Sequence, residues 1–234
     1  NGHIDAGTFA APVDITDANA TLTTNTNDWL ATATGTVTIN NVATLAEIDT
    51  INAHVDNGTT VATAITDANA TLTTNTNDWL ATATGTVTIN NVATLAEIDT
   101  INAHVDNGTT VATAITDATA TLATNTNDWL ATATGTITTN TAATLGQLDT
   151  INGHIDAGTF AAPVDITDAT ATLATNTNDW LATATGTITT NTAATLGQLD
   201  TINGHIDAGT FAAPVDITDA NATLTTNTND WLAT

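Results

Sequence analysis

The 234-residue sequence contains no cysteine, methionine, tyrosine, serine, lysine or arginine. Without cysteine the chain can form no disulfide framework and offers no thiolate. Without lysine or arginine it lacks the side chains that bind nucleic-acid phosphates, which excludes nucleic acid as a partner. The same absence disfavours docking on an anionic membrane. No apolar run reaches the roughly 18 residues that a membrane span needs, so we expect no direct membrane insertion.

The composition lacks most of the side chains that enzymes use for catalysis. Serine, cysteine and lysine nucleophiles are missing, and there is neither a phosphate-binding glycine loop nor an arginine to clamp a substrate. Paired carboxylates do occur, but they recur identically along the chain. Because an enzyme has no evident use for several copies of one active site in a row, we expect a protein that is not an enzyme.

Threonine is the most frequent residue, and carboxylates supply nearly all of the charge. The 24 Asp and Glu face only five His as possible cations, giving a formal net charge of −24. This charge repels itself and must be screened by salt or by divalent cations. Thr fills 63 positions, and 41% of the residues are apolar. The apolar fraction is high enough for a packed core, unlike that of disordered chains.

Internal repeats are the most informative feature of the chain. Residues 15–64 recur unchanged at 65–114, and residues 119–168 recur unchanged from 170 onward, at intervals of 50 or 51 residues. The motif ITDANATL or ITDATATL begins at Ile15, Ile65, Ile115, Ile166 and Ile217. We predict one continuous tandem-repeat array over 1–234, with partial repeats at both ends, cut from a longer mature array.

Two versions of the repeat differ in one linker. The linker reads HVDNGTTVATAITD at 54–67 and HIDAGTFAAPVDITD at 154–168, where it holds an additional residue. An insertion confined to one place predicts a surface loop. Each repeat also divides in two, because Leu22 and Leu45 both close an A-T-L tripeptide. The building block is therefore a half-repeat of about 25 residues.

Hydrophobic periodicity assigns elements within each repeat. Residues 34–41 and 60–67 alternate small or polar with β-branched residues, which predicts strands. Residues 42–55 carry apolar residues at helical spacing, which predicts a helix with Asn41 as N-cap. The sequence Asp-Asn-Gly at 56–58 would end this helix, with the glycine in the left-handed conformation. Residues 68–82 could form a helix capped by Asp67, a loop or a further strand.

These elements predict an α/β repeat solenoid in which short strands and helices alternate. One unit cannot bury both faces of its elements, whereas stacked units share a continuous core. The full repeat is 50–51 residues and the half-repeat about 25. An all-β solenoid is the alternative.

Carboxylates in turns are the best candidates for metal ligands, and the metal that they favour is calcium. The candidate ligands are Asp14, Asp17, Asp56, Asn57, Asp106 and Asn107. Turn formation and helix capping explain Asp17 and Asp56 without any ion. Neither the EF-hand pattern nor a glycine-rich calcium nonapeptide is present. The histidines, one per repeat, fit a helix end near its negative dipole better than a metal site.

Three further features have a structural and a functional reading. The five tryptophans could form a sugar-binding platform, but we favour an interior ladder in which each packs on its counterpart in the next repeat. These residues are Trp29, Trp79, Trp129, Trp180 and Trp231. Thr-x-Thr pairs suggest ice binding but are sparse, and the β-propensity of threonine explains them. Asn19, Asn69 and Asn221 in N-A-T, and Asn57 and Asn107 in N-G-T, are acceptors in form for glycans.

The alternation of I-T-D-A-x-A-T-L with A-A-T-L-x-Q-L-D-T-I (142–151) resembles repeats in very large secreted bacterial proteins. That group includes cyanobacterial-type surface and adhesin-like proteins rich in Thr, Ala and Asp. The resemblance implies secretion, display at the cell surface and often calcium dependence. The chain departs from the group in lacking calcium nonapeptides, Ser and Lys.

We therefore predict an extracellular or cell-surface structural protein whose arrays self-assemble into a fibre, sheath or surface layer. The partner would be a further copy of the chain. The alternative is the stalk or ligand-binding arm of a giant secreted adhesin, which would be a monomer with a distinct tip.

Overall fold

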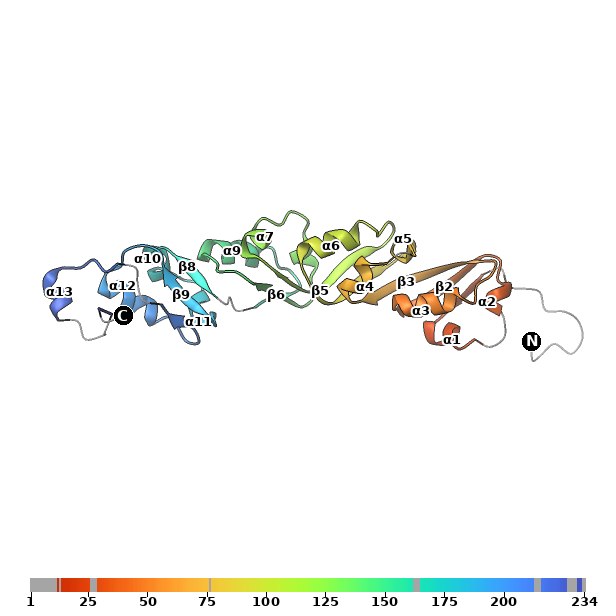
Figure 1. Ribbon diagram of the computed structural model, residues 1–234, viewed down its shortest axis with the longest axis horizontal. Helices are drawn as coiled ribbons and strands as arrows, with labels where there is room; N and C mark the ends of the chain where they lie inside the picture. Colours follow the sequence, from red (N-terminus) through yellow and green to blue (C-terminus); the bar gives the residue numbers. More distant parts are fainter. Residues whose placement is uncertain are drawn as a thin grey trace, which may run out of the picture. The chain divides into compact units, whose positions relative to one another are not determined.

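The computed structural model describes residues 12, 14–25, 29–75, 77–161, 165–212, 216–226 and 231–232. The chain forms two compact units, 1–113 and 114–234. Strands and helices alternate along it (Figure 1), which confirms an α/β repeat and rules out the all-β alternative. All paired strands are parallel.

The strands pair in chain order. One sheet runs β1 to β7, and a second has the order β10-β9-β8. The strands are β1 (Ile15–Asp17), β2 (Thr36–Ala43), β3 (Thr59–Asp67), β4 (Thr86–Ala93), β5 (Thr109–Asp117), β6 (Thr136–Thr139), β7 (Thr159–Phe160), β8 (Ile166–Asp168), β9 (Thr187–Thr190) and β10 (Thr210–Phe211). The predicted strands at 34–41 and 60–67 are confirmed as β2 and β3.

Each connection between paired strands contains helices. They are α1 (Asn19–Thr23), α2 (Trp29–Thr32), α3 (Leu45–Asn52), α4 (Asn69–Thr73), α5 (Trp79–Thr82), α6 (Leu95–Asn102), α7 (Thr119–Ala123), α8 (Trp129–Thr132), α9 (Leu145–Gly153), α10 (Thr170–Ala174), α11 (Trp180–Thr183), α12 (Leu196–Asn203) and α13 (Asn221–Thr225). All of these helices are shorter than the roughly 12–15 residues that an isolated helix needs to be stable in water, so packing against the sheet must hold them.

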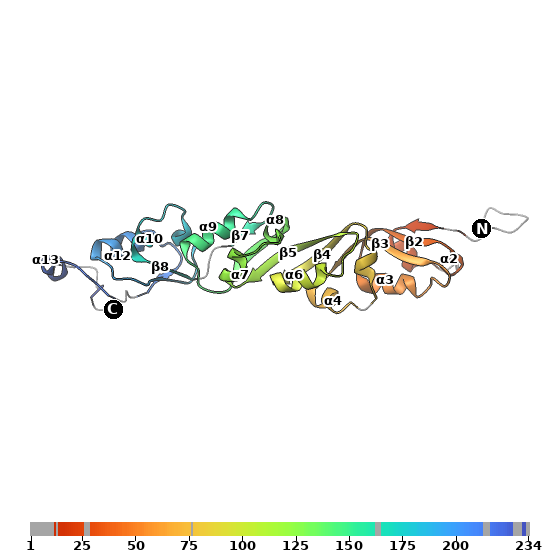
Figure 2. The same cartoon turned by 90° about the horizontal axis from the view of Figure 1, so that it is seen from above.

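The helices bury one face of the sheet. In β2, Val37 and Ile39 are fully buried, while Thr36 and Thr38, which alternate with them, are not. In α3 the buried residues are Leu45, Ile48 and Ile51, which share one helix face. Helices α3, α4 and α6 lie on one side of β2–β4 (Figure 2). The opposite, helix-free face of the sheet has no fully buried side chain among the described strand residues.

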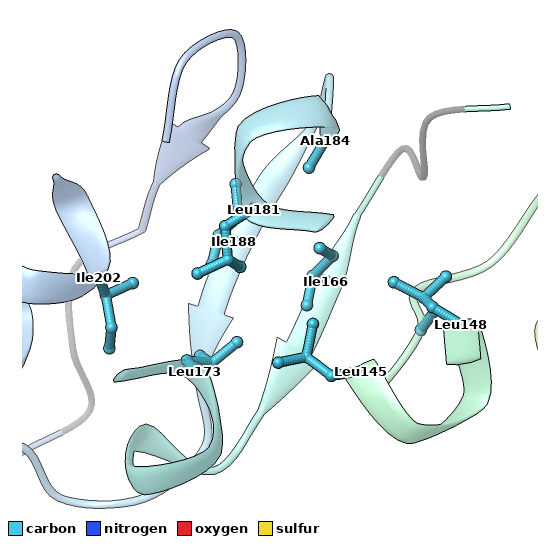
Figure 3. Packing of buried hydrophobic residues seen from close by; sticks show 9 residues of the cluster. Leu145, Leu148, Ile166, Leu173, Leu181, Ala184, Ile188 and Ile202 are labelled. Atoms are coloured by element: carbon cyan, nitrogen blue, oxygen red, sulfur yellow. The ribbon is translucent and has the colours of Figure 1, made fainter. Parts of the chain in front are cut away.

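The core is a single apolar layer between sheet and helices. In the second unit Ile166 of β8 and Ile188 of β9 point toward Leu173, Leu181 and other apolar side chains of the surrounding helices (Figure 3). Burying one such side chain contributes about 1.5–3 kcal/mol. The layer recurs in every half-repeat, which explains why the sequence repeats its Ile and Leu positions.

The sheet is staggered along the strand direction. Ala43 pairs with Ile65, and Ile65 pairs with Val87, so two steps across the sheet advance 44 residues, whereas the repeat is 50. The difference of six residues displaces the corresponding residue of the next repeat by roughly 20 Å along strands β2–β4. The C-terminal half of β3 therefore pairs with the beginning of β4.

The helix predicted at 42–55 starts later than expected. It begins at Leu45, and its N-cap is Thr44, whose hydroxyl accepts from the Glu47 N–H at 3.3 Å. The predicted cap, Asn41, lies in β2 instead. Gly58 does not adopt the left-handed conformation that we expected. Glycine is required at this position because a Cβ would stand 2.5 Å from the carbonyl oxygen of Gly35, which lies just before β2.

Residues 68–82 form two short helices rather than one. Helix α4 ends at Thr73, and α5 begins directly after Asp78, whose φ of 54° lies in the left-handed region that a continuous helix cannot accommodate. The predicted cap Asp67 makes a different contact, since the N-cap position of α4 is Ala68. Leu72 and Leu80 are buried as the apolar pattern indicates.

Candidate functional site

The polar residues that recur in every repeat join one half-repeat to the one before it. Asp67 ends β3, and its Oδ2 accepts a hydrogen bond from the Leu45 N–H at the start of α3, 3.2 Å away. Its Oδ1 accepts from the Ala68 N–H at 3.0 Å. Asp168 makes the same pair of contacts, to Leu145 at 2.9 Å and to Ala169 at 2.7 Å. A carboxylate at a helix N-terminus is stabilised by the unpaired N–H groups there.

A second joint links the first residue of α4, or of its counterpart α7 in the other repeat version, to the segment that contains the next strand. The Asn69 N–H donates to Asn91 Oδ1 at 2.7 Å, and Asn91 Nδ2 donates back to Asn69 Oδ1 at 3.0 Å. In the other repeat version threonines occupy both positions. The Thr119 N–H donates to Thr141 Oγ1 at 2.9 Å, and Thr119 Oγ1 donates to the Thr141 carbonyl at 2.8 Å. The two residues of the joint therefore change together.

Tryptophan forms the third joint. Trp79 is half-buried, and its Nε1 donates to Asp49 Oδ1 of α3 at 2.8 Å, where Asn77 Nδ2 also donates at 2.9 Å. Trp180 and Trp231 donate in the same way to Asp149 and Asp200, each at 2.8 Å. Trp29 and Trp129 are half-buried as well. Packing of each tryptophan on its counterpart stays a prediction.

The capping box of α3 lowers the pKa of its glutamate, Glu47. Glu47 Oε2 accepts from the Thr44 N–H at 2.8 Å and from the Thr44 hydroxyl at 3.0 Å. The Thr44 backbone N–H holds the pKa of Glu47 below its ordinary value; burial opposes this and the hydroxyl adds to it. Glu97 in α6 is held in the same way by Thr94. In α9 and α12 a neutral Gln takes this position.

The residues proposed as calcium ligands are spread over several contacts. Asp14 Oδ1 accepts from the Thr36 N–H at 2.7 Å, and Asp17 Oδ1 accepts from the Ala18 N–H at 2.8 Å. Asn57 Nδ2 donates to the Ala31 carbonyl at 2.8 Å, as Asn107 does to Ala81 at 2.9 Å. Asp56 and Asp106 are exposed. Within the described ranges no three His, Asp or Glu residues gather as a metal ion would require.

The asparagines of the glycosylation triplets also have partners. Asn69 Nδ2, the atom to which a glycan would attach, donates to the Val92 carbonyl at 3.2 Å. Asn19 Nδ2 donates likewise to Val42 at 3.2 Å, whereas the side chain of Asn221 lies outside the described residues. His54 Nδ1 lies 2.8 Å from the Thr50 carbonyl of its own helix, consistent with a helix-end role. His3 lies outside the described residues.

Sequence reasoning missed most partners in these joints. The pattern T-x-x-E at 44–47 is a capping-box signature and could have located the helix start. Asn19 and Asn41 are both replaced by threonine at 119 and 141, and this simultaneous replacement could have indicated that the two positions are in contact. Nothing in the sequence connects Trp79 with Asp49, which lies 30 residues away.

No helix in the described part of the chain is long and apolar enough to cross a bilayer. Comparison of the chain with protein-family models, with curated protein sequences and with solved structures gives no match.

Proposed function

We propose that the chain is part of an extracellular or cell-surface structural protein, a solenoid-like array whose copies self-assemble into a fibre, sheath or surface layer. The observation that carries this proposal is the use of the recurring polar residues. Asp67, the Asn69–Asn91 pair and Trp79 all contact the neighbouring half-repeat. Side chains that could have formed a binding or catalytic site are thus engaged in building the array.

The charge of the chain adds a condition to this proposal. Each copy carries a formal charge of −24 and no Lys or Arg. Copies can therefore associate only where salt or divalent cations screen their carboxylates. Calcium would act in this way by bridging exposed residues such as Asp56, without a dedicated site. Glycans are not part of the proposal, since Asn57 and Asn69 donate their amide protons within the repeat.

Electron microscopy of the purified chain with and without divalent cations tests the proposal. Fibres or sheets that loosen on chelation support it. A buffer of monovalent salt at the same ionic strength is the control, because it separates ion bridging from general screening. Isolated single molecules under all three conditions would contradict self-assembly and favour the adhesin stalk instead.

A further inference from the structure

The helix-free face of β2, β3, β4 and the start of β5 carries no charge, whereas Asp14, just before β1, lies at its edge and accepts from the Thr36 N–H. We define this face by the non-buried strand positions that alternate with the core: Thr36, Thr38, Asn40, Val42, Thr59, Val61, Ala64 and Thr66, with Thr86, Thr88, Asn90, Val92, Thr109 and Val111 one repeat later. It holds no Asp or Glu, although the chain has 24. The carboxylates lie instead in the helices, in the loops and at strand ends.

Two valines stand out on this face. Val42 is 52% exposed and Val92 is 53% exposed. Val42 pairs across the sheet with Ala64, next to the buried pair of Ala43 and Ile65, so it points away from the core. Exposed valines among methyl-bearing threonines give the face an apolar character that nothing else in the unit covers among the described residues.

The second repeat version lacks this character. Ala142 takes the position of Val42, and Asp165 takes the position of Ala64. The Asp165 carboxylate accepts a hydrogen bond from the Thr187 N–H of the neighbouring strand at 2.6 Å. The uncharged, valine-bearing face is therefore confined to the first version.

We propose that the helix-free face of residues 36–111 binds the same face of a second copy of this chain. The inference rests on the proposed self-assembly and names one surface that takes part in it, since a fibre or layer needs a further contact besides a closed pair. With no Lys or Arg on either copy, contacts through the helices or loops would bring carboxylates together, and like charges in contact cost several kcal/mol. The helix-free face avoids that cost. Because both copies present the same face, the contact is symmetric and closes as a dimer.

The size of the face sets the strength of the contact. A side chain on one face of a sheet covers about 32 Å², given strands about 4.8 Å apart and about 6.6 Å between alternate residues. The positions that define the face thus supply about 450 Å² per copy, against about 800 Å² per partner in a stable complex. The dimer is accordingly weak and reversible, and it tightens where several repeats act together.

Sedimentation velocity of the full chain over a range of concentrations tests the inference. The wild type is expected to show reversible dimers that strengthen as NaCl rises, since salt screens the repulsion between copies. The double variant Val42→Asp and Val92→Asp places two carboxylates on the face and is expected to weaken association at least about tenfold. The double variant Val42→Asn and Val92→Asn has the shape of the aspartate variant without its charge, and it is expected to weaken association less.

A matched control adds the same charge elsewhere. Ala46→Asp and Ala96→Asp introduce two carboxylates at exposed positions of α3 and α6, on the helix-covered side, and should leave the association within about twofold of wild type. The opposite change, Ala142→Val with Ala193→Val, extends the valine pattern into the second version and should strengthen association. Circular dichroism checks that each variant folds.

The outcomes separate the two proposals. If wild type associates but the face variants associate equally well, or the helix-side variants lose association as strongly, this surface is wrong and the structural function stands. If wild type remains monomeric at every salt concentration and with divalent cations, both proposals fail.

Discussion

The two repeat versions share the order of their helices but differ in their strands and in the side chains at the joints: the continuous β3 of the first version is replaced in the second by the short strands β7 and β8, which belong to different sheets. Residues 65–114 and 119–168 each carry five carboxylates, so charge does not distinguish them. They differ where two elements meet: Asn69 with Asn91 becomes Thr119 with Thr141, and the capping Glu97 becomes Gln147. Hydrogen bonding between half-repeats is thus retained while its chemistry changes.

The core differs between the versions at one buried position. Ile39 is fully buried, and in the other version its place is taken by Thr139, which is 1% exposed. Thr139 Oγ1 is buried without a hydrogen-bond partner, as is Thr190 Oγ1. An unpaired buried hydroxyl costs about 1–3 kcal/mol. The second version therefore has the less favourable core at this point.

The largest expected effect comes from exchanging this residue. Ile39→Thr should lower the free energy of unfolding by about 3 kcal/mol, because it removes apolar contact and buries a hydroxyl. Thr139→Val, which keeps the shape and removes the hydroxyl, should raise it by about 1 kcal/mol. Urea unfolding followed by tryptophan fluorescence measures both. A destabilising Thr139→Val would mean that the hydroxyl has a partner, and would reverse the ranking of the two cores.

The next effect concerns an aromatic contact that only the second version has. Phe160 packs edge-on against Trp180, with ring centroids 5.5 Å apart. The first version has Thr60 instead, whose hydroxyl donates to Asn52 at 2.9 Å. Phe160→Thr should cost about 2 kcal/mol, from lost apolar burial and the lost ring pair. It should also shift Trp180 fluorescence to the red, whereas Phe160→Leu should lose less stability. Equal losses would assign the whole effect to apolar burial.

A smaller effect tests whether the joint residues are coupled. Thr119→Asn alone places a mismatched pair opposite Thr141 and should cost about 1 kcal/mol. Adding Thr141→Asn recreates the pair of the first version and should restore most of the loss, with a coupling of about 0.5–1.5 kcal/mol. Chemical denaturation of the wild type, both single variants and the double variant gives this value. Additive changes would show that the two positions are independent.

The smallest effect is a difference in acid sensitivity. The folded-state pKa of Glu47 and Glu97 lies below the ordinary value of 4.5. Their contribution is therefore present above pH 4.5 and is lost as the pH falls through the lowered pKa. The capping boxes with Gln147 and Gln198 do not titrate. On acidification, the stability of α3 and α6 should fall by a few tenths of a kcal/mol more than that of α9 and α12.

Hydrogen exchange read by mass spectrometry measures this difference, since peptides of the two versions differ in sequence. Because the versions carry equal numbers of carboxylates, the general effect of acid on charge repulsion is the same for both. Glu47→Gln with Glu97→Gln should abolish the difference. An equal loss of protection in both versions would remove the capping box as its cause.

Local periodicity predicted the elements but not the joints. Alternating β-branched residues located β2 and β3, and apolar spacing located α3, because both patterns depend only on neighbouring residues. The cap was wrong because Asn41 and Thr44 are both good N-caps, and the choice depends on Asn19, which pairs with Asn41 across 22 residues. Gly58 was misread for the same reason, since its constraint comes from Gly35 in another half-repeat.

The most direct test of the central claim is hydrogen exchange in an Asp168→Ala variant. If recurring polar residues hold successive half-repeats together, removing this carboxylate should lower protection at the start of α9 around Leu145, 23 residues earlier, as well as at Ala169. Helix α12, which is capped through Asp219, should keep its protection. Loss of protection confined to residues next to Asp168, with α9 unchanged, would contradict the account.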